Sequence, residues 1–325
     1  MPMKIVRFLL ASLFTCAAAP AALAWGEEGH RAIGAMADQL LTGTSAARHV
    51  HELLGEETLS TASVWADAVK GQMDQTEEML QFKAANPSHA VSHYTDIPFE
   101  EAKYRDDSIG ATNVDVVHAI PACLLILQGK PEAQKVFKDV TPRVALRLLA
   151  HYIEDLHQPL HVGAGYLDKT NFVDPNGYTG HYGDDQGGNR LSYGGATRFQ
   201  LHSYWDTTVV RAVMKQAQVE TPRQLAAYLL AKPAPAWQTS GPLLEWDRAW
   251  ANESIALSAK VHDVVVTEED DSQQDFRTGK PRPQWHIKEL SPEYVAWSTK
   301  AAEDQMTKAG YRLAATLEAL WPDTK

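Results

Sequence analysis

The sequence predicts an all-α protein, a single compact helical domain with long irregular loops. Apolar residues recur every three, four or seven positions near the start and the end of the chain, which is typical of helices that pack one face on a core. After a leader of residues 1–24, about 300 residues remain, enough for one large domain or two modest ones. The chain has no internal repeat and no convincing linker, so a single domain is expected.

Residues 1–24 have the features of a secretory signal peptide. Lys4 and Arg7 give a positive start, an apolar stretch follows, and a small-x-small cleavage site ends at Ala24. The apolar stretch is too short for a membrane anchor, and no stop-transfer pattern follows it. We therefore expect a secreted or periplasmic protein that starts at Trp25 and has no stable membrane association.

Charge and cysteine content exclude some classes of protein. Without Lys4 and Arg7 the net charge of −11 becomes −13, which argues against a basic patch as the source of nucleic-acid affinity. Only Cys123 remains after cleavage, so the mature monomer has no internal disulfide. Cys123 lies in an apolar run and is expected in the core.

The helices are expected in the following order. The first contains apolar residues at helical spacing between Ile33 and Leu41, and an apolar run from Val144 to Leu149 suits a buried helix. Residues 267–283 are acidic, then basic and Pro-rich, and are expected to form a surface excursion. Further helices are expected at about 43–54, 58–70, 204–218, 224–230 and 243–261, and from Ser291-Pro292 through Leu320.

The stretch from Ala150 to Val162 contains the strongest chemical signal. His151 and Asp155 are four residues apart, so on a helix their side chains lie on one face. Pro159 ends or kinks the helix, which allows His161 to return to the same region. Imidazoles and a carboxylate that converge in an apolar setting are typical of a zinc site, although a helix end with scattered histidines is the simpler alternative.

Other parts of the chain offer further ligands. His202 and Asp206 repeat the spacing of four, and two such pairs could hold several metal ions with a bridging carboxylate. The amino and carbonyl groups of Trp25 could chelate an ion together with His30, which is otherwise a helix-face histidine. Four more candidates are Asp67 and Lys70 on a predicted helix, where an ion pair is the alternative, and His93 and Asp96 before a proline.

Taken together in this order, these motifs resemble the S1/P1 nuclease family. The chain contains Trp25 with His30, WAD-x-x-K, HYTD-x-P, HY-x-x-DLHQPLHVG, GGN and LHSYWDT. The resemblance covers nearly all of residues 25–325 and implies one helical domain with three zinc ions at the bottom of a cleft. It also implies cleavage of single-stranded DNA and RNA to 5′-phosphorylated products and removal of 3′-phosphates from nucleotides. Unlike the fungal and plant members, this chain lacks disulfides.

The resemblance also implies a role for each matching residue. Asp96 would orient or deprotonate the attacking water, and Lys70 would stabilise charge in the transition state. His157 lies within the central motif but is expected to support the ligands rather than bind metal. The implied zinc ligands are Asp67, His93, His151 and Asp155 for one ion; His161, His202 and Asp206 for a second; and Trp25 and His30, with Asp155 shared as a bridge, for the third.

The Gly-, Tyr- and Asp-rich segment 163–198 is expected to be a long functional loop that lines the cleft. Asn189 could hydrogen-bond a base or phosphate, or could simply fix the turn through its side chain. Tyr182 could stack on a base, as could Tyr166 or Tyr178, although exposed loop tyrosines are common.

Three functions fit the sequence. The favoured one is a monomeric zinc nuclease and 3′-nucleotidase, and the alternatives are a zinc-dependent phospholipase C and an exported zinc-binding protein without catalysis. The HQPLHVG context and the GGN loop favour the nuclease. Zinc-dependent hydrolysis of single-stranded DNA distinguishes it from the other two, and hydrolysis of phosphatidylcholine without nuclease activity selects the phospholipase.

Overall fold

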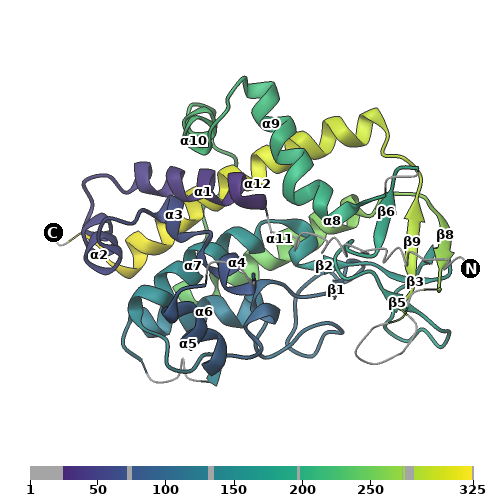
Figure 1. Ribbon diagram of the computed structural model, residues 1–325, viewed down its shortest axis with the longest axis horizontal. Helices are drawn as coiled ribbons and strands as arrows, with labels where there is room; N and C mark the ends of the chain where they lie inside the picture. The colour runs from purple at the N-terminus through teal and green to yellow at the C-terminus, as the bar shows by residue number, and fades with distance from the viewer. Residues whose placement is uncertain are drawn as a thin grey trace, which may run out of the picture.

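The computed structural model describes residues 25–71, 75–130, 135–195, 198–272, 274 and 282–323. Helices make up most of this part of the chain, and the short strands gather at one end of the molecule (Figure 1). This mainly helical, single-domain architecture confirms the predicted fold class. The expected signal peptide, residues 1–24, lies outside the described residues. Within them, no helix is long and apolar enough to cross a membrane.

The expected helical segments are all observed, with two local differences, whereas α5 and α6 lie in segments for which no helix was predicted. The segment 58–70 forms two short helices rather than one, because the chain turns at Ser63 and Val64. Residues 204–208 form a π-helical turn before the next α-helix begins. The helices are α1 (Gly26–Leu40), α2 (Ser45–Leu54), α3 (Leu59–Ala62), α4 (Trp65–Lys70), α5 (Glu77–Ala85), α6 (Val116–Leu127), α7 (Pro142–Leu156), α8 (Leu201–Ser203), α9 (Val209–Ala217), α10 (Pro222–Leu230), α11 (Trp246–Val261) and α12 (Pro292–Leu320).

Side-chain caps fix where many of these helices begin. A threonine or serine oxygen accepts a backbone N–H of the first turn and so satisfies a group that the helix itself leaves unpaired. Proline follows the cap at the start of α7, α10 and α12, where its missing N–H costs nothing. The capping residues are Thr44, Thr58, Thr76, Thr141, Thr221 and Ser291.

Two apolar clusters form the core, and α7 and α1 bring them together. The first cluster surrounds α6 and α7, and every residue of α7 from Val144 to Leu156 is buried. The second cluster lies among α1, α9, α10 and α12. A close approach joins α1 to α3, because a Cβ at Gly34 would lie 2.6 Å from the Leu59 carbonyl oxygen. Polar side chains on α7 therefore lie between the two apolar clusters.

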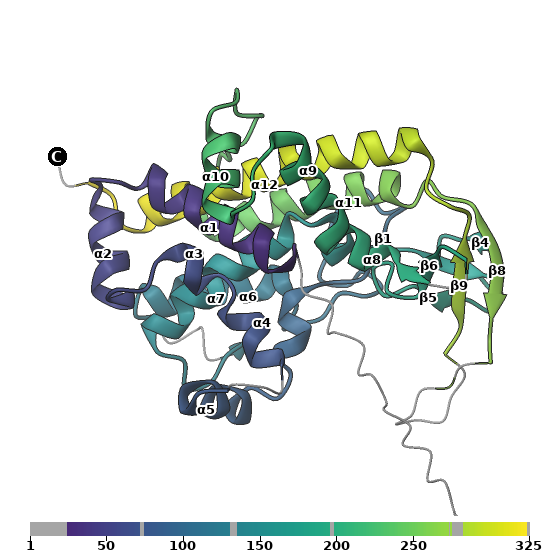
Figure 2. The ribbon, with the colours of Figure 1, turned by 45° about the horizontal axis from the view of Figure 1, so that its top comes forward.

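The segments between the long helices form three small sheets, which the sequence did not predict. β1 (Ile97–Pro98) pairs in parallel with β2 (Gly163–Ala164). β3 (Tyr166–Asp168) pairs with both β4 (Asn171–Phe172) and β5 (Gly183–Asp184). The third sheet has the order β7-β6-β9-β8 and lies at the end of the molecule away from α2 (Figure 2). Its strands are β6 (Leu191–Tyr193), β7 (Phe199–Gln200), β8 (Val266–Asp270) and β9 (Gln284–Ile287).

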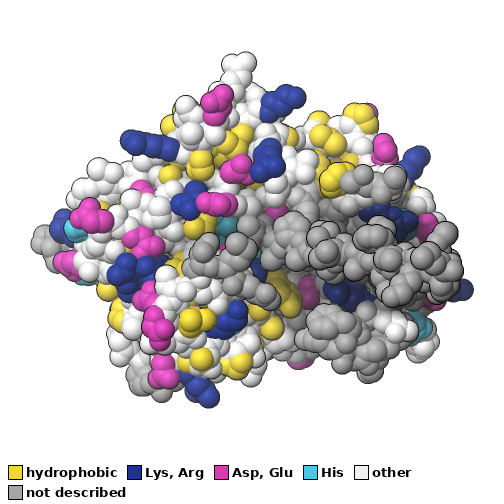
Figure 3. Space-filling model, in the orientation of Figure 1, with side chains coloured by type: hydrophobic (Ala, Val, Ile, Leu, Met, Phe, Trp, Pro, Cys, Tyr) yellow, Lys and Arg dark blue, Asp and Glu magenta, His cyan; other side chains and the backbone are white. Residues whose placement is uncertain are grey.

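The third sheet joins distant parts of the sequence. β6 and β9 run parallel, with Leu191 opposite Trp285, so the segment after residue 266 lies beside the expected loop. The predicted surface excursion at 267–283 is thus partly a hairpin arm, β8, while residues 273 and 275–281 lie outside the described residues. On the face shown in Figure 3, lysine and arginine side chains are scattered among acidic ones.

Candidate metal centre

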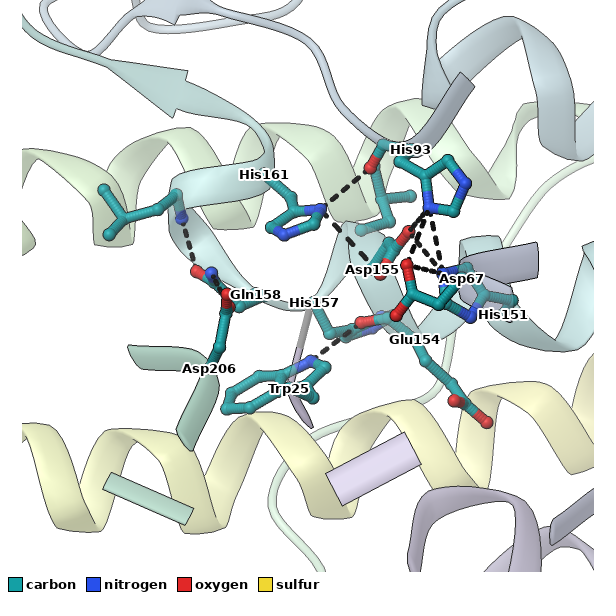
Figure 4. A network of polar contacts seen from close by, with 12 residues as sticks. Trp25, Asp67, His93, His151, Glu154, Asp155, His157, Gln158, His161 and Asp206 are labelled. Atoms are coloured by element: carbon teal, nitrogen blue, oxygen red, sulfur yellow. Dashed lines mark hydrogen bonds and ion pairs between the residues drawn. The ribbon is translucent and has the colours of Figure 1, made fainter. Parts of the chain in front are cut away.

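The buried helix α7 places the first ligands. His151 and Asp155 lie one turn apart on the same face, as their spacing predicts, and neither side chain is exposed. α7 ends at Leu156, Pro159 begins a 3₁₀ turn, and His161 at the end of that turn comes back toward Asp155. Figure 4 shows His161, His93, Asp67 and His151 arranged around Asp155.

Four side chains form the first ligand group. The ligating atoms of His93, His151 and Asp155 lie 3.0 Å from one another, and Asp67 Oδ1 lies 3.7 Å from both imidazole nitrogens. Atoms that each lie about 2.0 to 2.1 Å from a tetrahedral zinc ion are about 3.3 Å apart. The observed spacings bracket that value, so these atoms fit the coordination shell of a zinc ion.

A second group is made from His161, His202 and Asp206. His202 Nε2 lies 3.3 Å from Asp206 Oδ2, and the rings of His161 and His202 stack with centroids 5.0 Å apart. One potential ligand atom from each of the three side chains falls within 4.8 Å of the others. The two His/Asp pairs of the sequence therefore lie in neighbouring groups.

His30, His151 and Asp155 form a third group that could hold a metal ion. His30 Nε2 lies 3.5 Å from Asp155 Oδ1, the oxygen opposite the one that faces His93 and His151. Asp155 thus presents one oxygen to each group, which is the arrangement of a bridging carboxylate. Trp25 is buried nearby, and its indole Nε1 donates to the Glu154 carbonyl at 2.9 Å. Its ligation through a free amino group remains a prediction, because Ala24 lies outside the described residues.

Outer hydrogen bonds fix which ring nitrogen faces inward for His151, His161 and His202. The Nδ1 atoms of His161 and His202 bond the carbonyls of His93 at 2.9 Å and Gly187 at 2.7 Å, so their Nε2 atoms face the centre. His151 Nδ1 bonds the Ser63 carbonyl at 2.5 Å. Partners of this kind set the tautomer of metal-binding histidines.

Two of the outer partners escaped the sequence analysis. Glu154 Oε2 lies 2.5 Å from His30 Nδ1, and Gln158 Nε2 donates to Asp206 Oδ1 at 2.8 Å. Glu154 precedes the predicted ligand Asp155, and Gln158 lies three residues from both Asp155 and His161, but only the three-dimensional contacts reveal their role. His157 is directed away from the centre, and its Nε2 faces the Arg312 guanidinium at 2.9 Å.

The charges of the site suit a bound cation. Burial lowers the pKa of His93 and His161 well below its usual value and that of His202 to about 4, so these rings are neutral and able to bind metal. Burial raises the pKa of Asp155 to about 6 and that of Asp206 well above its usual value. A divalent ion at the centre would instead lower the pKa of both carboxyl groups.

Buried polar atoms that lack a hydrogen-bond partner show whether the residues of the centre fit bound metal ions. Within the described part of the chain, the buried atoms of the ligand groups that lack a hydrogen-bond partner include Asp155 Oδ1, His161 Nε2 and Asp206 Oδ2. Leaving such atoms buried and unpaired is costly. Coordination of metal ions would satisfy them, so the residues present fit the expected ions.

A cavity of about 180 Å³ opens onto the ligand groups. Lys70 lies at its wall, with Nζ 3.0 Å from Asp67 Oδ1. Burial alone would lower the pKa of Lys70, but Asp67 and Asp155 outweigh it and keep the ammonium charged. The lining residues are Lys70, His93, Tyr94, Asp96, Leu160, His161, Gln186, Asn189 and His202.

Asp96 is held at the cavity by its backbone. Its carbonyl accepts a hydrogen bond from the Tyr166 hydroxyl at 2.8 Å. Gly110, at φ 84°, packs so closely that a Cβ there would lie 1.9 Å from the Asp96 carbonyl oxygen. Burial, and then Asp184 and Asp185, raise the pKa of Asp96 well above its usual value. This carboxyl group therefore holds a proton more readily than an exposed one.

The two expected substrate-binding residues differ in position. Asn189 lines the cavity, and its Nδ2 also donates to the Gln186 carbonyl at 2.9 Å, so it fixes the turn as well. Tyr182 packs edge-on against Tyr166, with ring centroids 5.7 Å apart, and is not among the lining residues. Tyr94, which the sequence analysis did not select, lines the cavity and is 37% exposed.

Comparison with known proteins connects this centre to a family. The family model described as S1/P1 Nuclease matches residues 25–321, nearly all of the described chain. The chain belongs to the S1/P1 nuclease family. Nuclease S1 of Aspergillus oryzae is 25% identical over 97% of this chain and 98% of its own length. Endonuclease 2 of Arabidopsis thaliana is 24% identical over 97% of each chain.

This membership confirms the resemblance drawn from the motifs and supports a nuclease activity. Another relative, Endonuclease 4 of Arabidopsis thaliana, is 25% identical over 92% of this chain. As an S1/P1 nuclease, the protein acts on nucleic acid as its substrate.

Proposed function

We propose that the protein is a zinc-dependent phosphodiesterase that hydrolyses single-stranded DNA and RNA to 5′-phosphorylated products and also removes 3′-phosphates from nucleotides. The observation that carries the proposal is the meeting of three buried His/Asp groups around Asp155, at the base of a cavity that also holds Lys70 and Asp96. A centre with both a charged lysine and a proton-accepting carboxyl group is built for hydrolysis rather than for metal storage.

Each ligand group is proposed to hold one zinc ion, giving three in all. Asp67, His93, His151 and Asp155 would bind the first, and His161, His202 and Asp206 the second. His30 would bind the third with Trp25 and the shared Asp155. Bound ions of this kind lower the pKa of water and stabilise charge on the attacking and departing oxygens of a phosphodiester.

The residues at the cavity have complementary proposed roles. Asp96 would orient the attacking water and accept its proton, because burial and neighbouring carboxylates raise its affinity for protons. Lys70 would stabilise the negative charge that develops on the phosphoryl oxygens, because its ammonium lies at the cavity wall. Asn189 would donate a hydrogen bond to the substrate, and Tyr182 would contact a base further from the cavity.

We further propose that export removes residues 1–24 and leaves a monomer in the periplasm or outside the cell. Cleavage after Ala24 would create the free amino group that the third zinc ion requires. The active domain would then comprise residues 25–325.

The experiment compares correctly cleaved protein with a version that carries one extra residue before Trp25. Zinc content and activity on single-stranded DNA are measured for both, with a 3′-mononucleotide as a second substrate. We expect three zinc ions and strong activity in the cleaved form, with both reduced in the extended form. A 3′-mononucleotide that is not hydrolysed would contradict the 3′-nucleotidase part.

Other outcomes discriminate among the alternatives. Full zinc and activity in the extended form would remove Trp25 from the centre and leave the nuclease proposal intact. Zinc without hydrolysis of any nucleic acid would contradict the proposal. Phosphatidylcholine vesicles then distinguish a phospholipase from a protein that only binds zinc.

A further inference from the structure

Two arginines from distant segments lie side by side at the edge of the centre. Arg190 directly follows Asn189, and Arg282 precedes β9, the strand that pairs with β6. The backbone brings them together, because Trp285 N donates to the Arg190 carbonyl at 2.8 Å. Both residues are half-buried. Burial lowers the pKa of Arg190, Asp184 opposes that effect, and Arg282 lowers the pKa further, which places the two charges near each other.

Neither guanidinium forms an ion pair with a carboxylate in the described part of the chain. Among the described residues, Arg282 Nη2 donates to the Gln186 side-chain oxygen at 3.1 Å, and the buried Nε atoms of both arginines have no partner there. Arg147, by contrast, is buried between Glu57 and Glu78 and pairs with both. Two neighbouring, partly desolvated guanidiniums without a carboxylate partner are the arrangement that binds an anion.

The nearby carboxylates are already engaged elsewhere. Asp185 pairs with His262 at 2.9 Å and accepts two backbone N–H groups, from Gly165 and Gly188. Asp184 accepts the Gln186 backbone N–H at 2.6 Å. Within the described residues, the Nη groups of Arg190 and the remaining Nη group of Arg282 therefore stay available to a ligand.

The arginines lie next to the cavity rather than inside it. Gln186 and Asn189 both line the cavity, and Arg282 contacts the first while Arg190 follows the second in sequence. A polynucleotide whose cleaved bond lies over the ligand groups extends past the cavity wall, and the two arginines lie beside that wall.

We propose that Arg190 and Arg282 form a subsite for the phosphate adjacent to the bond that is cleaved. This inference rests on the proposed nuclease function and adds a preference for substrates with more than one phosphate. The two guanidiniums bind the anionic oxygens of that phosphate and position the strand. They are positioning residues for the reaction and take no part in bond cleavage.

The test uses substrates that differ by a single phosphate. Full-length, zinc-loaded wild type and the variants Arg190→Met and Arg282→Met are compared on the dinucleotide dTpdT, the trinucleotide dTpdTpdT and a 3′-mononucleotide. We expect each variant to lower kcat/KM for the trinucleotide about 10- to 100-fold, the scale of a lost charge-assisted hydrogen bond. Activity on dTpdT and on the mononucleotide should stay within about two-fold of wild type.

Two further measurements sharpen the test. The salt dependence of binding to single-stranded DNA should lose about 0.7 from its slope for each phosphate contact removed. Arg198→Met provides a matched control, because Arg198 is an exposed arginine that directly precedes β7 and whose guanidinium contacts His286. It should leave all activities unchanged. Arg190→Lys keeps the charge and should retain part of the trinucleotide preference.

The outcomes separate this proposal from the proposed function. Equal losses on all three substrates, or no loss on the trinucleotide, would overturn the phosphate subsite. If wild type hydrolyses none of the nucleotide substrates, the nuclease proposal itself fails. A variant with a lowered Tm is judged by its ratio of trinucleotide to dinucleotide activity, which a general loss of folded protein does not change.

Discussion

At the scale of single residues, Asp155 organises the centre, because each of its carboxylate oxygens faces a different ligand group. Oδ2 lies 3.0 Å from both His93 and His151, and Oδ1 lies 3.5 Å from His30. The sequence predicted Asp155 as a ligand, because a spacing of four from His151 places both side chains on one face of a helix. It did not predict Glu154, which lies on α7 beside Asp155 and reaches His30 instead.

Glu154→Gln should weaken metal binding about 10- to 100-fold, because second partners of metal-binding histidines have effects of this size. The change replaces the carboxyl group that contacts His30 Nδ1 at 2.5 Å with an amide of similar volume. Competition with a chromophoric zinc chelator measures the affinity. Glu253→Gln, which alters an exposed partner of Arg312, is the control. Equal affinities for wild type and Glu154→Gln would contradict this role.

His118 should make stability depend on pH. The hydrogen bond to Asp115 at 3.1 Å raises the pKa of His118, and although burial opposes this, Asp115 and Asp106 add to it. Because the folded pKa is raised, the stabilisation is fully present below the unfolded pKa of about 6.5 and is lost as pH rises through the folded value.

Urea unfolding at pH 5.5 and pH 8.5 measures this effect. His118→Gln should lower the free energy of unfolding by about 0.5 kcal/mol more at the lower pH, the scale of a partly exposed pair. His51→Gln, at an exposed position on α2, should show no such difference. A larger cost at pH 8.5 would mean that the pKa is lowered instead.

At the scale of elements, one buried pair of side chains connects the end of α11 to the glycine-rich turn formed by residues 185–189. His262 Nε2 lies 2.9 Å from Asp185 Oδ2, and neither side chain is exposed. The turn that Asp185 supports contributes the Gly187 carbonyl that orients His202. Gly187 must remain glycine, because its φ is 56° and a Cβ would lie 2.1 Å from the Leu160 carbonyl oxygen.

His262→Leu should lower the free energy of unfolding by about 3 to 5 kcal/mol, because it leaves a buried carboxylate without its partner. Zinc affinity should also fall, since the turn that orients His202 loses its support. Urea unfolding and zinc titration measure the two effects. His286→Leu, a half-buried histidine on β9 that bonds Ser192, is the comparison and should cost less. Similar costs for both changes would mean that the pair does not support the turn.

The sequence could predict those elements whose boundaries are marked by neighbouring residues, but not the contacts between distant segments. Thr141 with Pro142, and Ser291 with Pro292, mark the starts of α7 and α12 in the sequence itself. The pairing of β6 with β9 joins residues about ninety positions apart and leaves no local pattern. His262 had no identifiable partner in the sequence for the same reason, since Asp185 lies far away along the chain.

At the scale of the whole molecule, the ligands lie at the junction of the two apolar clusters, so the centre contributes to the stability of both. α7 belongs to the first cluster, while Trp25, Trp205 and Leu160 belong to the second. Buried carboxylates at this junction repel one another unless cations separate them. The extent to which metal stabilises the fold could not be deduced from the motifs, because it depends on how deeply the ligands are buried.

Removal of metal with a chelator should lower Tm by roughly 10 to 20 °C, the combined effect expected if the three proposed zinc ions bind only the folded state. Differential scanning calorimetry measures the change. Added Zn²⁺ should restore Tm, whereas Mg²⁺ should not, because imidazole ligands favour zinc. An unchanged Tm after complete metal removal would contradict a stabilising centre.

The order of the ligands along the chain determines when the centre can form. The ligand side chains extend from His30 to Asp206, and the supporting His262 comes later still. A nascent chain that still lacks its last third holds all of these ligand side chains but lacks His262, and so lacks the buried pair that supports the turn. We therefore expect the centre to reach its final geometry only after the last third of the chain has folded, so a chain that ends before His262 should bind metal less tightly than the full chain.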